Sequence, residues 1–206
     1  MVSMKVIKEG AEAKLFLTDF EGRKAVLKKR VNKRYRNKVL DNSLIKKRTR
    51  QEYSLLNKAN NYGVRVPLTY SLDVKNGSLL MEFIDGLRLK DYLNKGKNKL
   101  SACKKVGKSI ARLHKSNIIQ GDLTTSNFII NNKNGPVILD FGLGQISPKI
   151  EDKATDLLNL KKTFLATHSS IKEGWRTITK EYCKNYKLGQ NVLIKLEEIE
   201  KRARYK

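Results

Sequence analysis

The sequence has few of the residues that mark several common classes of protein. Cysteine occurs only at Cys103 and Cys183, and histidine only at His114 and His168. The histidines are too few and too far from the cysteines for a zinc site, and two cysteines favour reduced thiols over a disulfide framework. No run approaches the roughly 18 consecutive apolar residues of a membrane span, and the first ten residues lack an apolar signal-peptide core. We therefore expect no membrane association and a cytoplasmic location.

Acidic residues are also scarce relative to basic ones. The 206 residues include 44 lysines and arginines against 20 aspartates and glutamates, a formal net charge of +24. Basic residues concentrate in two runs, 28–50 and 87–115, each of which contains a single acid. Such runs are often only a solvated, lysine-rich surface. At this excess we favour a surface for a polyanion, such as RNA or an acidic partner protein.

The first part of the chain predicts short strands around one helix. Alternating runs from residue 4 to residue 30, broken by Gly10 and by a turn at Glu21-Gly22, predict three strands. Residues 43–60 predict a helix with one shared face, made of Ile45, Thr49, Glu52 and Leu56. Residues 68–84 predict a hairpin, because Asn76-Gly77 suits the two positive φ angles of a type I′ turn.

The rest of the chain is typical of helices. Asp85-Gly86 looks like a break between lobes, and Ser101 can cap a helix that follows it. The apolar stripe of this helix consists of Ala102, Val106, Ile110 and Leu113. A second hairpin-like unit turns at residues 132–135, and further helices are expected from about residue 153 to 168 and through the C-terminal third. Residues 200–206 form a polar, basic tail with nothing to bury.

Three polar residues stand at defined intervals in the second half. Asp122 and Asn127 are followed by Asp140, which opens the sequence Asp140-Phe141-Gly142. Each alone would more often be a turn residue. Together, between apolar strand-like runs, they resemble the catalytic loop and D-F-G motif of the protein kinase superfamily. The resemblance implies ATP and Mg²⁺ as cofactors, with Asn127 and Asp140 as oxygen ligands of the metal. Asp122 would accept a proton from the acceptor hydroxyl or orient a water.

Upstream residues resemble the kinase elements that hold the nucleotide. The strand Ala25-Val26-Leu27-Lys28 is similar to the V-A-I-K strand, so Lys28 would bind the α- and β-phosphates and pair with Glu52. A loop around Gly10 would cover the phosphates, since small residues permit close backbone approach. The backbone at the hinge would bond the adenine edge. The expected nucleotide contacts in and next to the loop are Ile7, Gly10, Ala11 and Ala13. Those at the hinge are Glu82 and Ile84.

The sequence departs from ordinary protein kinases in several places. Gln120 replaces the usual histidine of the catalytic loop, and Gly121 replaces the usual arginine. Asp156 resembles the helix aspartate that bonds the catalytic-loop backbone, but only thirteen residues separate it from Gly142. No A-P-E motif lies between them. We expect a shortened activation segment, no platform for a peptide substrate and no switching by loop phosphorylation.

Longer stretches are similar to one atypical branch, the kinase subunits of the KEOPS complex. They lie at residues 9–13, 27–30, 33–36, 40–41, 48–52, 121–127, 150–157 and 201–204. Two positions differ from the family's usual residue: Gln120, just before the most specific string at 121–127, stands where histidine is usual, and Ala203 stands where glycine is usual. The first mismatch predicts looser packing of the catalytic loop, and the second a change in the backbone freedom of the tail.

The resemblance implies a compact α+β, bilobal, protein-kinase-like fold as a single domain, residues 1–206. Residues 1–84 would form a lobe of antiparallel sheet plus helix, residues 85–199 a mainly helical lobe, and residues 200–206 the basic tail. The implied function is an atypical serine/threonine kinase and ATPase. It would act in tRNA modification with the threonylcarbamoyl transferase and other KEOPS subunits, and bind tRNA through its basic surface.

Two other functions remain open at this point. A small-molecule or sugar kinase of the same fold would use the same aspartate and asparagine residues. A non-catalytic RNA-binding scaffold would retain the fold alone, although the intact set of Lys28, Glu52, Asp122, Asn127 and Asp140 is evidence against it. Rapid phosphorylation of a sugar would favour the first alternative, and failure to bind magnesium-ATP would favour the second.

Overall fold

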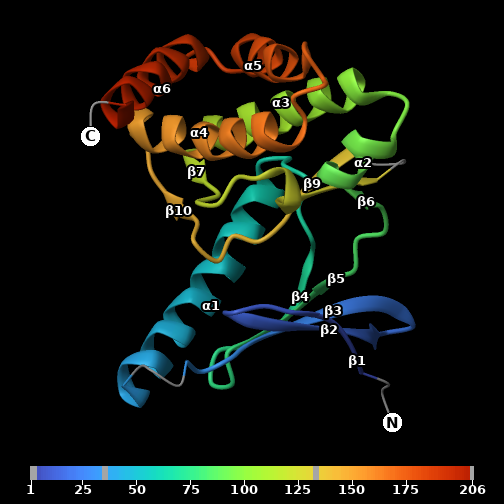
Figure 1. The fold of residues 1–206 in the computed structure, drawn as a ribbon. Helices are drawn as coiled ribbons and strands as arrows, with labels where there is room; N and C mark the ends of the chain where they lie inside the picture. Colours follow the sequence, from blue (N-terminus) through green and yellow to red (C-terminus); the bar gives the residue numbers. More distant parts are fainter. Residues whose placement is uncertain (1–3, 34–36, 132–134, 205–206) are drawn as a thin grey trace.

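The computed structural model describes residues 4–33, 37–131 and 135–204. They form two lobes (Figure 1), one built on an antiparallel sheet and a larger one built mainly from helices. The N-terminal lobe contains β1 (Lys5–Glu9), β2 (Ala13–Phe20), β3 (Arg23–Arg30), α1 (Lys38–Asn61), β4 (Thr69–Asp73) and β5 (Ser78–Glu82). The predicted order of strands and helix in this lobe is confirmed, while the predicted lobe boundary at residue 85 stays a prediction.

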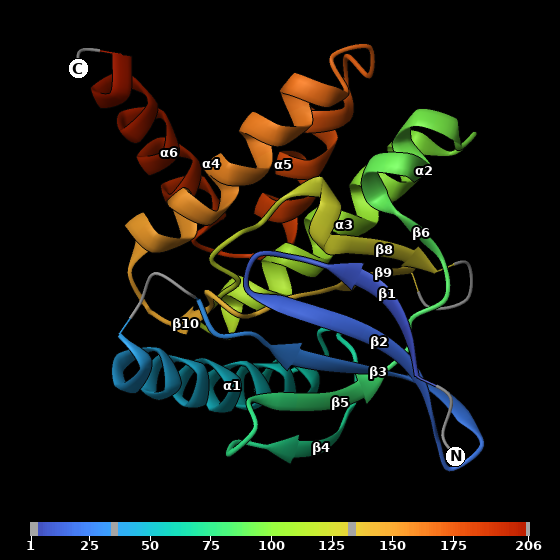
Figure 2. The ribbon, with the colours of Figure 1, turned by 60° about the horizontal axis from the view of Figure 1, so that its bottom comes forward.

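The five strands form one sheet in the order β1-β2-β3-β5-β4, with α1 running beside it (Figure 2). β2 and β3 join through Glu21 and Gly22, whose φ angles of 53° and 73° are those of a tight hairpin turn. The type I′ turn predicted at Asn76-Gly77 is wrong, because only Gly77 of that pair has a positive φ. Residues 74–77 form a longer turn, in which the Asp73 carboxylate accepts the N–H of Asn76 at 3.0 Å.

Helix α1 begins at Lys38 and not at residue 43 as predicted. The earlier start follows from Asn37, whose side-chain oxygen accepts hydrogen bonds from two N–H groups of the first turn. Residues 34–36, part of one family-like stretch, lie outside the described residues. Three of the four residues on the predicted inward face are fully buried: Thr49, Glu52 and Leu56. The helix thus carries a buried carboxylate toward the sheet.

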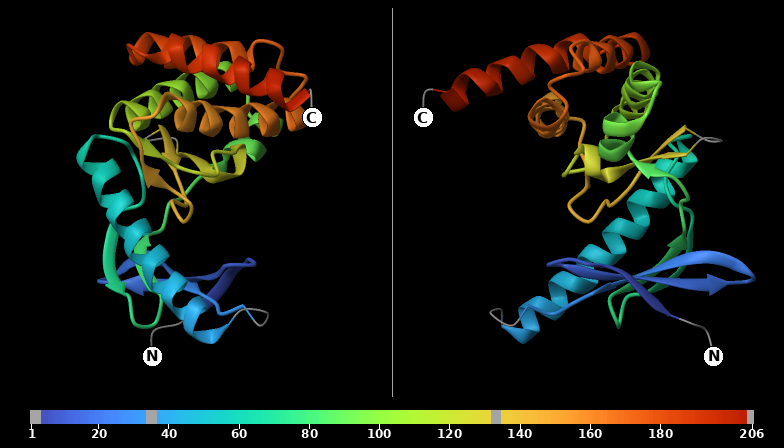
Figure 3. Two further views of the ribbon diagram at one scale, coloured as in Figure 1. Left: turned by 90° about the vertical axis from the view of Figure 1, so that its left-hand side faces the viewer. Right: turned by 45° about the vertical axis from the view of Figure 1, so that its right-hand side comes forward.

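The C-terminal lobe is mainly helical (Figure 3). Its helices are α2 (Leu89–Lys95), α3 (Lys99–Lys115), α4 (Ile150–Thr167), α5 (Gly174–Asn185) and α6 (Gly189–Arg204), with a 3₁₀ turn η1 (Thr125–Asn127). Its strands are β6 (Leu87–Arg88), β7 (Ile118–Ile119), β8 (Phe128–Asn131), β9 (Gly135–Ile138) and β10 (Gln145–Ile146). Among the described residues, no helix combines the length and apolarity that crossing a bilayer requires.

The predicted apolar stripe of α3 is buried, but the helix does not begin at Ser101. Asn98 occupies the cap position, and α3 begins at Lys99. The carbonyl of Asn98 accepts the N–H of Ala102 at 3.1 Å, which is the first hydrogen bond of the helix. Ser101 therefore lies inside the helix. On the stripe, Ala102, Val106, Ile110 and Leu113 are all at most 5% exposed.

The C-terminal helices pack closely around α3. A Cβ atom at Gly107 would lie 2.3 Å from the carbonyl oxygen of Ile178, so only glycine allows α3 and α5 to approach this closely. Helix α6 continues to Arg204, so residues 200–204 are helical and not the separate tail that was predicted. One reason is that Glu200 forms an ion pair with Lys161 of α4 at 2.6 Å. Residues 205 and 206 lie outside the described residues.

Two small sheets carry the loops that face the N-terminal lobe. β8 and β9 form the predicted second hairpin, although the central residues of its turn, 132–134, lie outside the described residues. β10 pairs with β7 in a two-stranded sheet. Residues 143–149 are all that separates Gly142 from α4, which confirms the short activation segment.

Candidate active site

A cleft of about 250 Å³ lies where the N-terminal sheet faces the loops of the larger lobe. Its walls are formed by Lys8, Gly10, Ala11, Glu12, Ala13, Leu15, Lys28, Arg30, Asp122, Asp140, Gly142 and Leu143. Six residues predicted for the site are among them: Gly10, Ala11, Ala13, Lys28, Asp122 and Asp140. The lining does not include the other predicted residues, Ile7, Glu52, Glu82, Ile84 and Asn127. The cleft therefore contains most of the residues expected to contact phosphates or metal, and none of the three expected to contact the adenine.

Lys28 forms two ion pairs that join the lobes. Its ammonium donates to Glu52 Oε1 of α1 at 2.6 Å and to Asp140 Oδ1 of the larger lobe at 2.8 Å. The predicted pairing with Glu52 is thus present. Burial alone would lower the pKa of Lys28, but the charges of Glu52 and Asp140 outweigh it and raise the pKa. Lys28 is consequently a charged group fixed inside the cleft.

Asp140 is held in an unusual backbone conformation. Its φ of 55° lies in the left-handed region, which a residue with a side chain seldom adopts. Its Oδ1 also accepts the N–H of Gly142 at 3.1 Å. Burial would raise the pKa of Asp140, but the Lys28 charge and these hydrogen bonds lower it overall. The carboxylate is therefore ionised, as a metal ligand must be.

Asp122 and Asn127 meet through the short turn η1. The Asn127 amide nitrogen donates to the Asp122 carboxylate at 2.9 Å and to its backbone carbonyl at 2.8 Å. This leaves the Asn127 side-chain oxygen as an acceptor. The Asn127 carbonyl in turn accepts the N–H of Leu139, the neighbour of Asp140, at 2.8 Å. Carboxylate and amide oxygens are the ligands that Mg²⁺ prefers, so these residues fit that ion.

Asp156 of α4 binds the backbone of the catalytic loop. Its two carboxylate oxygens accept the backbone N–H groups of Gln120 at 2.7 Å and Gly121 at 2.8 Å, as the sequence predicted. His114 lies behind it, with Nε2 3.3 Å from the same carboxylate and Nδ1 2.8 Å from the Tyr182 hydroxyl. All of these groups are buried except Gly121, which is partly exposed. The loop is therefore fixed by a polar network within the helical core.

Gln120 does not loosen the loop, and that expectation is wrong. The side chain is fully buried, its Nε2 donates to the carbonyls of Leu139 and Asp140, and its Oε1 accepts the N–H of Asp122 at 2.8 Å. One amide thus ties both aspartates of the site together. No local sequence pattern indicates this role, because it depends on where the D-F-G segment lies in space relative to the catalytic loop.

The missing arginine also has a structural reason. Gly121 has a φ of 87°, and a Cβ atom there would lie 2.3 Å from the carbonyl oxygen of Leu143. No residue with a side chain fits without moving the segment that follows Gly142. The predicted change at Ala203 is likewise not one of tail freedom, because Ala203 lies within α6.

The expected hinge residues, Glu82 and Ile84, do not line the cleft. The N–H of Glu82 donates to the carbonyl of Leu68 at 2.8 Å, and its carboxylate pairs with Arg65. The N–H of Glu82 is thus already used within the N-terminal lobe, and the contacts expected of Glu82 and Ile84 stay predictions. Ile7 is 43% exposed on β1, which leaves its expected contact a prediction as well.

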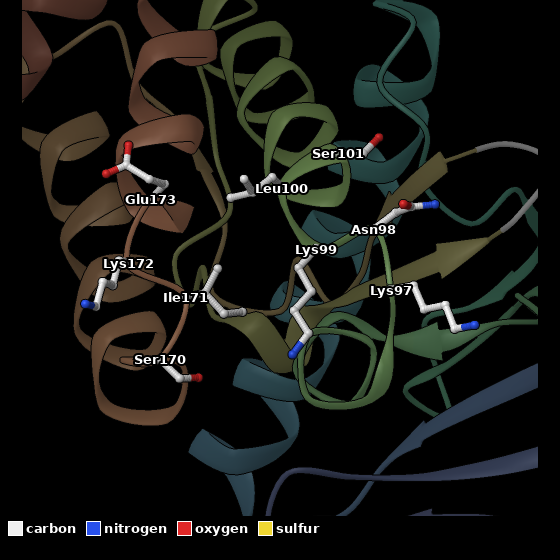
Figure 4. Close-up of a pocket in the computed structure, with 9 residues that line it drawn as sticks. All are labelled: Lys97, Asn98, Lys99, Leu100, Ser101, Ser170, Ile171, Lys172 and Glu173. Carbon is white, nitrogen blue, oxygen red and sulfur yellow. The ribbon is translucent and has the colours of Figure 1, made fainter.

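A second depression lies away from this cleft (Figure 4). It has a volume of about 710 Å³ and lies between the start of α3 and the segment before α5. Its lining residues include three lysines, Lys97, Lys99 and Lys172, and a single acid, Glu173. It does not offer the paired acidic groups of the cleft, so we assign the chemistry to the cleft between the lobes.

Comparison with known proteins identifies the family. A family model described as the RIO domain matches residues 7–164, and the KEOPS complex subunit Bud32 of Pyrococcus abyssi is 39% identical to this chain. That alignment covers 98% of this chain and 97% of the relative. The chain belongs to the Bud32 family of RIO-domain proteins. The resemblance to KEOPS kinase subunits is confirmed.

Other relatives extend the comparison. The EKC/KEOPS complex subunit bud32 of Dictyostelium discoideum is 38% identical over 98% of this chain and 83% of its own length. A probable bifunctional tRNA threonylcarbamoyladenosine biosynthesis protein of Methanocaldococcus jannaschii is 35% identical over 97% of this chain but only 37% of its own length. Among solved structures, a Rio2 kinase–ADP/Mg²⁺–phosphoaspartate complex from Chaetomium thermophilum matches with a TM-score of 0.67 and 17% identity, over 100% of this chain and 72% of that one. The kinase-like fold is confirmed.

The position of Lys28 in the cleft leads to a test of the strand register. Lys28→Ala should reduce ATP turnover by about 100-fold or more, because it removes the buried cation expected to bind the phosphates of the nucleotide. Lys29→Ala should leave turnover unchanged, since Lys29 is exposed on the other face of β3. Steady-state kinetics with both variants decide this, and a greater loss in Lys29→Ala would contradict the assignment.

The contacts of Gln120 lead to a second test. Gln120→Ala should lower the free energy of unfolding by about 2 kcal/mol, because it leaves buried backbone groups unpaired. It should also lower kcat at a temperature where the variant remains folded. Urea unfolding and kinetics provide both quantities, with Gln190→Ala on the exposed side of α6 as the matched control. An unchanged kcat would show that Gln120 does not position the aspartates.

Proposed function

We propose that this protein is a magnesium-dependent ATPase and atypical serine/threonine kinase that acts in tRNA threonylcarbamoyladenosine modification. The observation that carries the proposal is the pair of contacts from Lys28 to Glu52 and Asp140, which places a cation and a carboxylate side by side in the cleft. The ADP/Mg²⁺ complex of the Rio2 kinase with the same fold supports a nucleotide and magnesium as ligands.

Each residue of the cleft has a separate task in this proposal. Lys28 would bind the α- and β-phosphates, and Asp140 with the Asn127 side-chain oxygen would hold the metal. Magnesium, when bound, would neutralise charge on the phosphates. Asp122 would accept the proton of an acceptor hydroxyl or orient a water, because its exposed carboxylate has Asn127 as its fixed neighbour.

The covering of the nucleotide depends on the loop after β1. The N–H of Gly10 donates to the carbonyl of Ala13 at 3.0 Å, so the loop turns tightly above the cleft. Small side chains at Gly10, Ala11 and Ala13 would let the backbone approach the phosphates. Ile7 from β1, with the backbone of Glu82 and Ile84, would bound the adenine.

The short segment 143–149 bears on the acceptor. It leaves no platform for an extended peptide, which supports water or a docked partner as the working acceptor. The bifunctional relative is named for tRNA threonylcarbamoyladenosine biosynthesis and is much longer than the part that matches this chain. We therefore propose the threonylcarbamoyl transferase subunit and other KEOPS subunits as partners. A cytoplasmic location belongs to the same proposal and is supported by the two free cysteines.

The two basic runs have different surroundings, which locates a candidate tRNA surface. In the first run, Lys28 and Arg30 are buried in the cleft, whereas the second run supplies the exposed face of α3. α3 contains no acidic residue, and α5, packed against it, contains only Glu181. The exposed basic residues on these helices are Lys104, Lys105, Lys108, Arg112, Lys115, Arg176, Lys180 and Lys184. A repeating row of phosphates would match this α3–α5 basic face.

Replacing the proposed carboxylate ligand tests the enzymatic activity. Asp140→Asn should reduce magnesium-dependent ATP hydrolysis by roughly 100- to 1000-fold while the protein stays folded. Asp19→Asn, at the exposed end of β2, is the control and should retain full turnover. Turnover by Asp140→Asn equal to wild type would refute the metal assignment. Faster phosphorylation of a sugar than of the partner or water would favour the small-molecule kinase instead.

A salt titration tests the tRNA surface. The triple variant Lys104→Gln, Lys108→Gln, Arg112→Gln should reduce the magnitude of the slope of log affinity against log salt for tRNA by about 2 to 3, because three phosphate contacts are lost. The matched control, Lys46→Gln, Lys47→Gln, Arg50→Gln on α1, should keep the slope. Equal slopes for both variants would refute the α3–α5 basic face, and binding of polyglutamate in place of tRNA would point to an acidic protein partner.

A further inference from the structure

Arg30 is a buried arginine in the cleft to which no task has yet been assigned. It ends β3 two residues after Lys28, and strand alternation places both side chains on the same face. Arg30 is 6% exposed and lines the same cleft as Lys28, Asp122 and Asp140. Arginine is seldom buried without a charged partner, so its contacts indicate its role.

The Arg30 guanidinium joins three parts of the site. Its Nη2 donates to Glu52 Oε2 at 2.7 Å, while Lys28 holds the other oxygen of the same carboxylate at 2.6 Å. Its Nη1 lies 3.7 Å from the carboxylate of Glu12, in the loop that follows β1. A Cβ atom on Gly142 would lie 2.9 Å from Nη2, so the guanidinium packs directly on the D-F-G glycine.

The sharing of Glu52 between two cations has a consequence for nucleotide binding. Lys28 is bound to Glu52 and Asp140, and in the proposed function it must turn toward phosphates while Asp140 turns toward a metal. Glu52 is 2% exposed. A buried carboxylate that loses its only cation is strongly destabilised. Arg30 supplies the second cation, so Glu52 keeps a charged partner whichever way Lys28 points.

We propose that Arg30 is a positioning residue that holds Glu52, and through it α1, in place independently of Lys28. The inference rests on the proposed function, because it assumes that Lys28 binds phosphate. Two further contacts also hold α1 in this position. Arg48 donates to Glu12 at 2.8 Å, and the Gln51 amide donates to the carbonyl of Gly144.

In this arrangement, the position of α1 is set by permanent ion pairs and not by phosphorylation of a loop. Gly121 stands where an arginine would receive a phosphorylated loop, and residues 143–149 are too few to form such a loop. The inward position of α1 therefore depends on contacts built into the fold. We expect turnover to begin without a lag and without prior phosphorylation.

The test compares Arg30→Gln and Arg30→Lys with Arg50→Gln, an exposed arginine of α1, as the matched control. Arg30→Gln should raise KM for magnesium-ATP and weaken magnesium-ADP binding roughly 10- to 100-fold, because Lys28 is then retained by Glu52. Arg30→Lys should restore most of the affinity, and Arg50→Gln should match wild type. A lower melting temperature with unchanged KM would show a merely structural role and overturn the inference.

A double-mutant cycle with Glu52→Gln separates positioning from direct phosphate contact. In that background Arg30→Gln should add little further loss of nucleotide affinity, because no buried charge remains to compete for Lys28. Fully additive losses would mean that Arg30 contacts the nucleotide itself, which overturns the inference. Failure of the wild type to bind magnesium-ADP would overturn the proposed function and this inference with it. Normal binding by both wild type and Arg30→Gln would overturn the inference alone.

Discussion

The ion pairs of Lys28 are the interaction on which the rest of the site depends. A single buried ammonium joins α1 through Glu52 and the larger lobe through Asp140, at 2.6 and 2.8 Å. Lys28 and Glu52 are buried, whereas the Asp140 side chain is 53% exposed. Burying charges is unfavourable unless they are paired, so the relative placement of the lobes is coupled to the charges of Lys28 and Asp140. The raised pKa of Lys28 and the lowered pKa of Asp140 are two expressions of this coupling. Both groups remain charged across the neutral range, as the proposed chemistry requires.

The catalytic loop is fixed by a second, independent set of contacts. Asp156 receives two backbone N–H groups of the loop, and Gln120 bonds to Asp122 and to the carbonyl of Asp140. Asp122 and Asp140 are thereby positioned by the helical core and not by the nucleotide. This explains how a chain with a very short activation segment can keep both aspartates in register. A neutral amide also avoids placing another titrating group beside them, which a histidine would introduce.

Much of this arrangement could be predicted from the sequence, because it depends on local spacing. The order of strands and helix along the chain and the buried stripe of α3 follow from periodicity, whereas the Lys28–Glu52 pair and the Asp156 contacts are expected from the resemblance to kinase motifs. The errors share a different cause. The start of α1 depends on a cap at Asn37, the turn before β5 depends on the side chain of Asp73, and the role of Gln120 depends on a segment about 20 residues away in sequence. Arg30 was missed because it looked like one more member of a basic run.

The two basic runs have different surroundings in the structure, so charge counts alone do not identify a polyanion-binding surface. Residues 28–50 and 87–115 have similar composition, yet Lys28 and Arg30 of the first run are buried in the cleft, where both pair with Glu52 and Lys28 also pairs with Asp140. Every lysine and arginine of α3 except the partly buried Lys99 is exposed, and the helix has no acid to offset them. The α3–α5 basic face is therefore more positive than the chain as a whole, whereas the cleft is close to balanced. A polyanion and a magnesium nucleotide would then be attracted to different faces of one small protein, so that binding one need not displace the other.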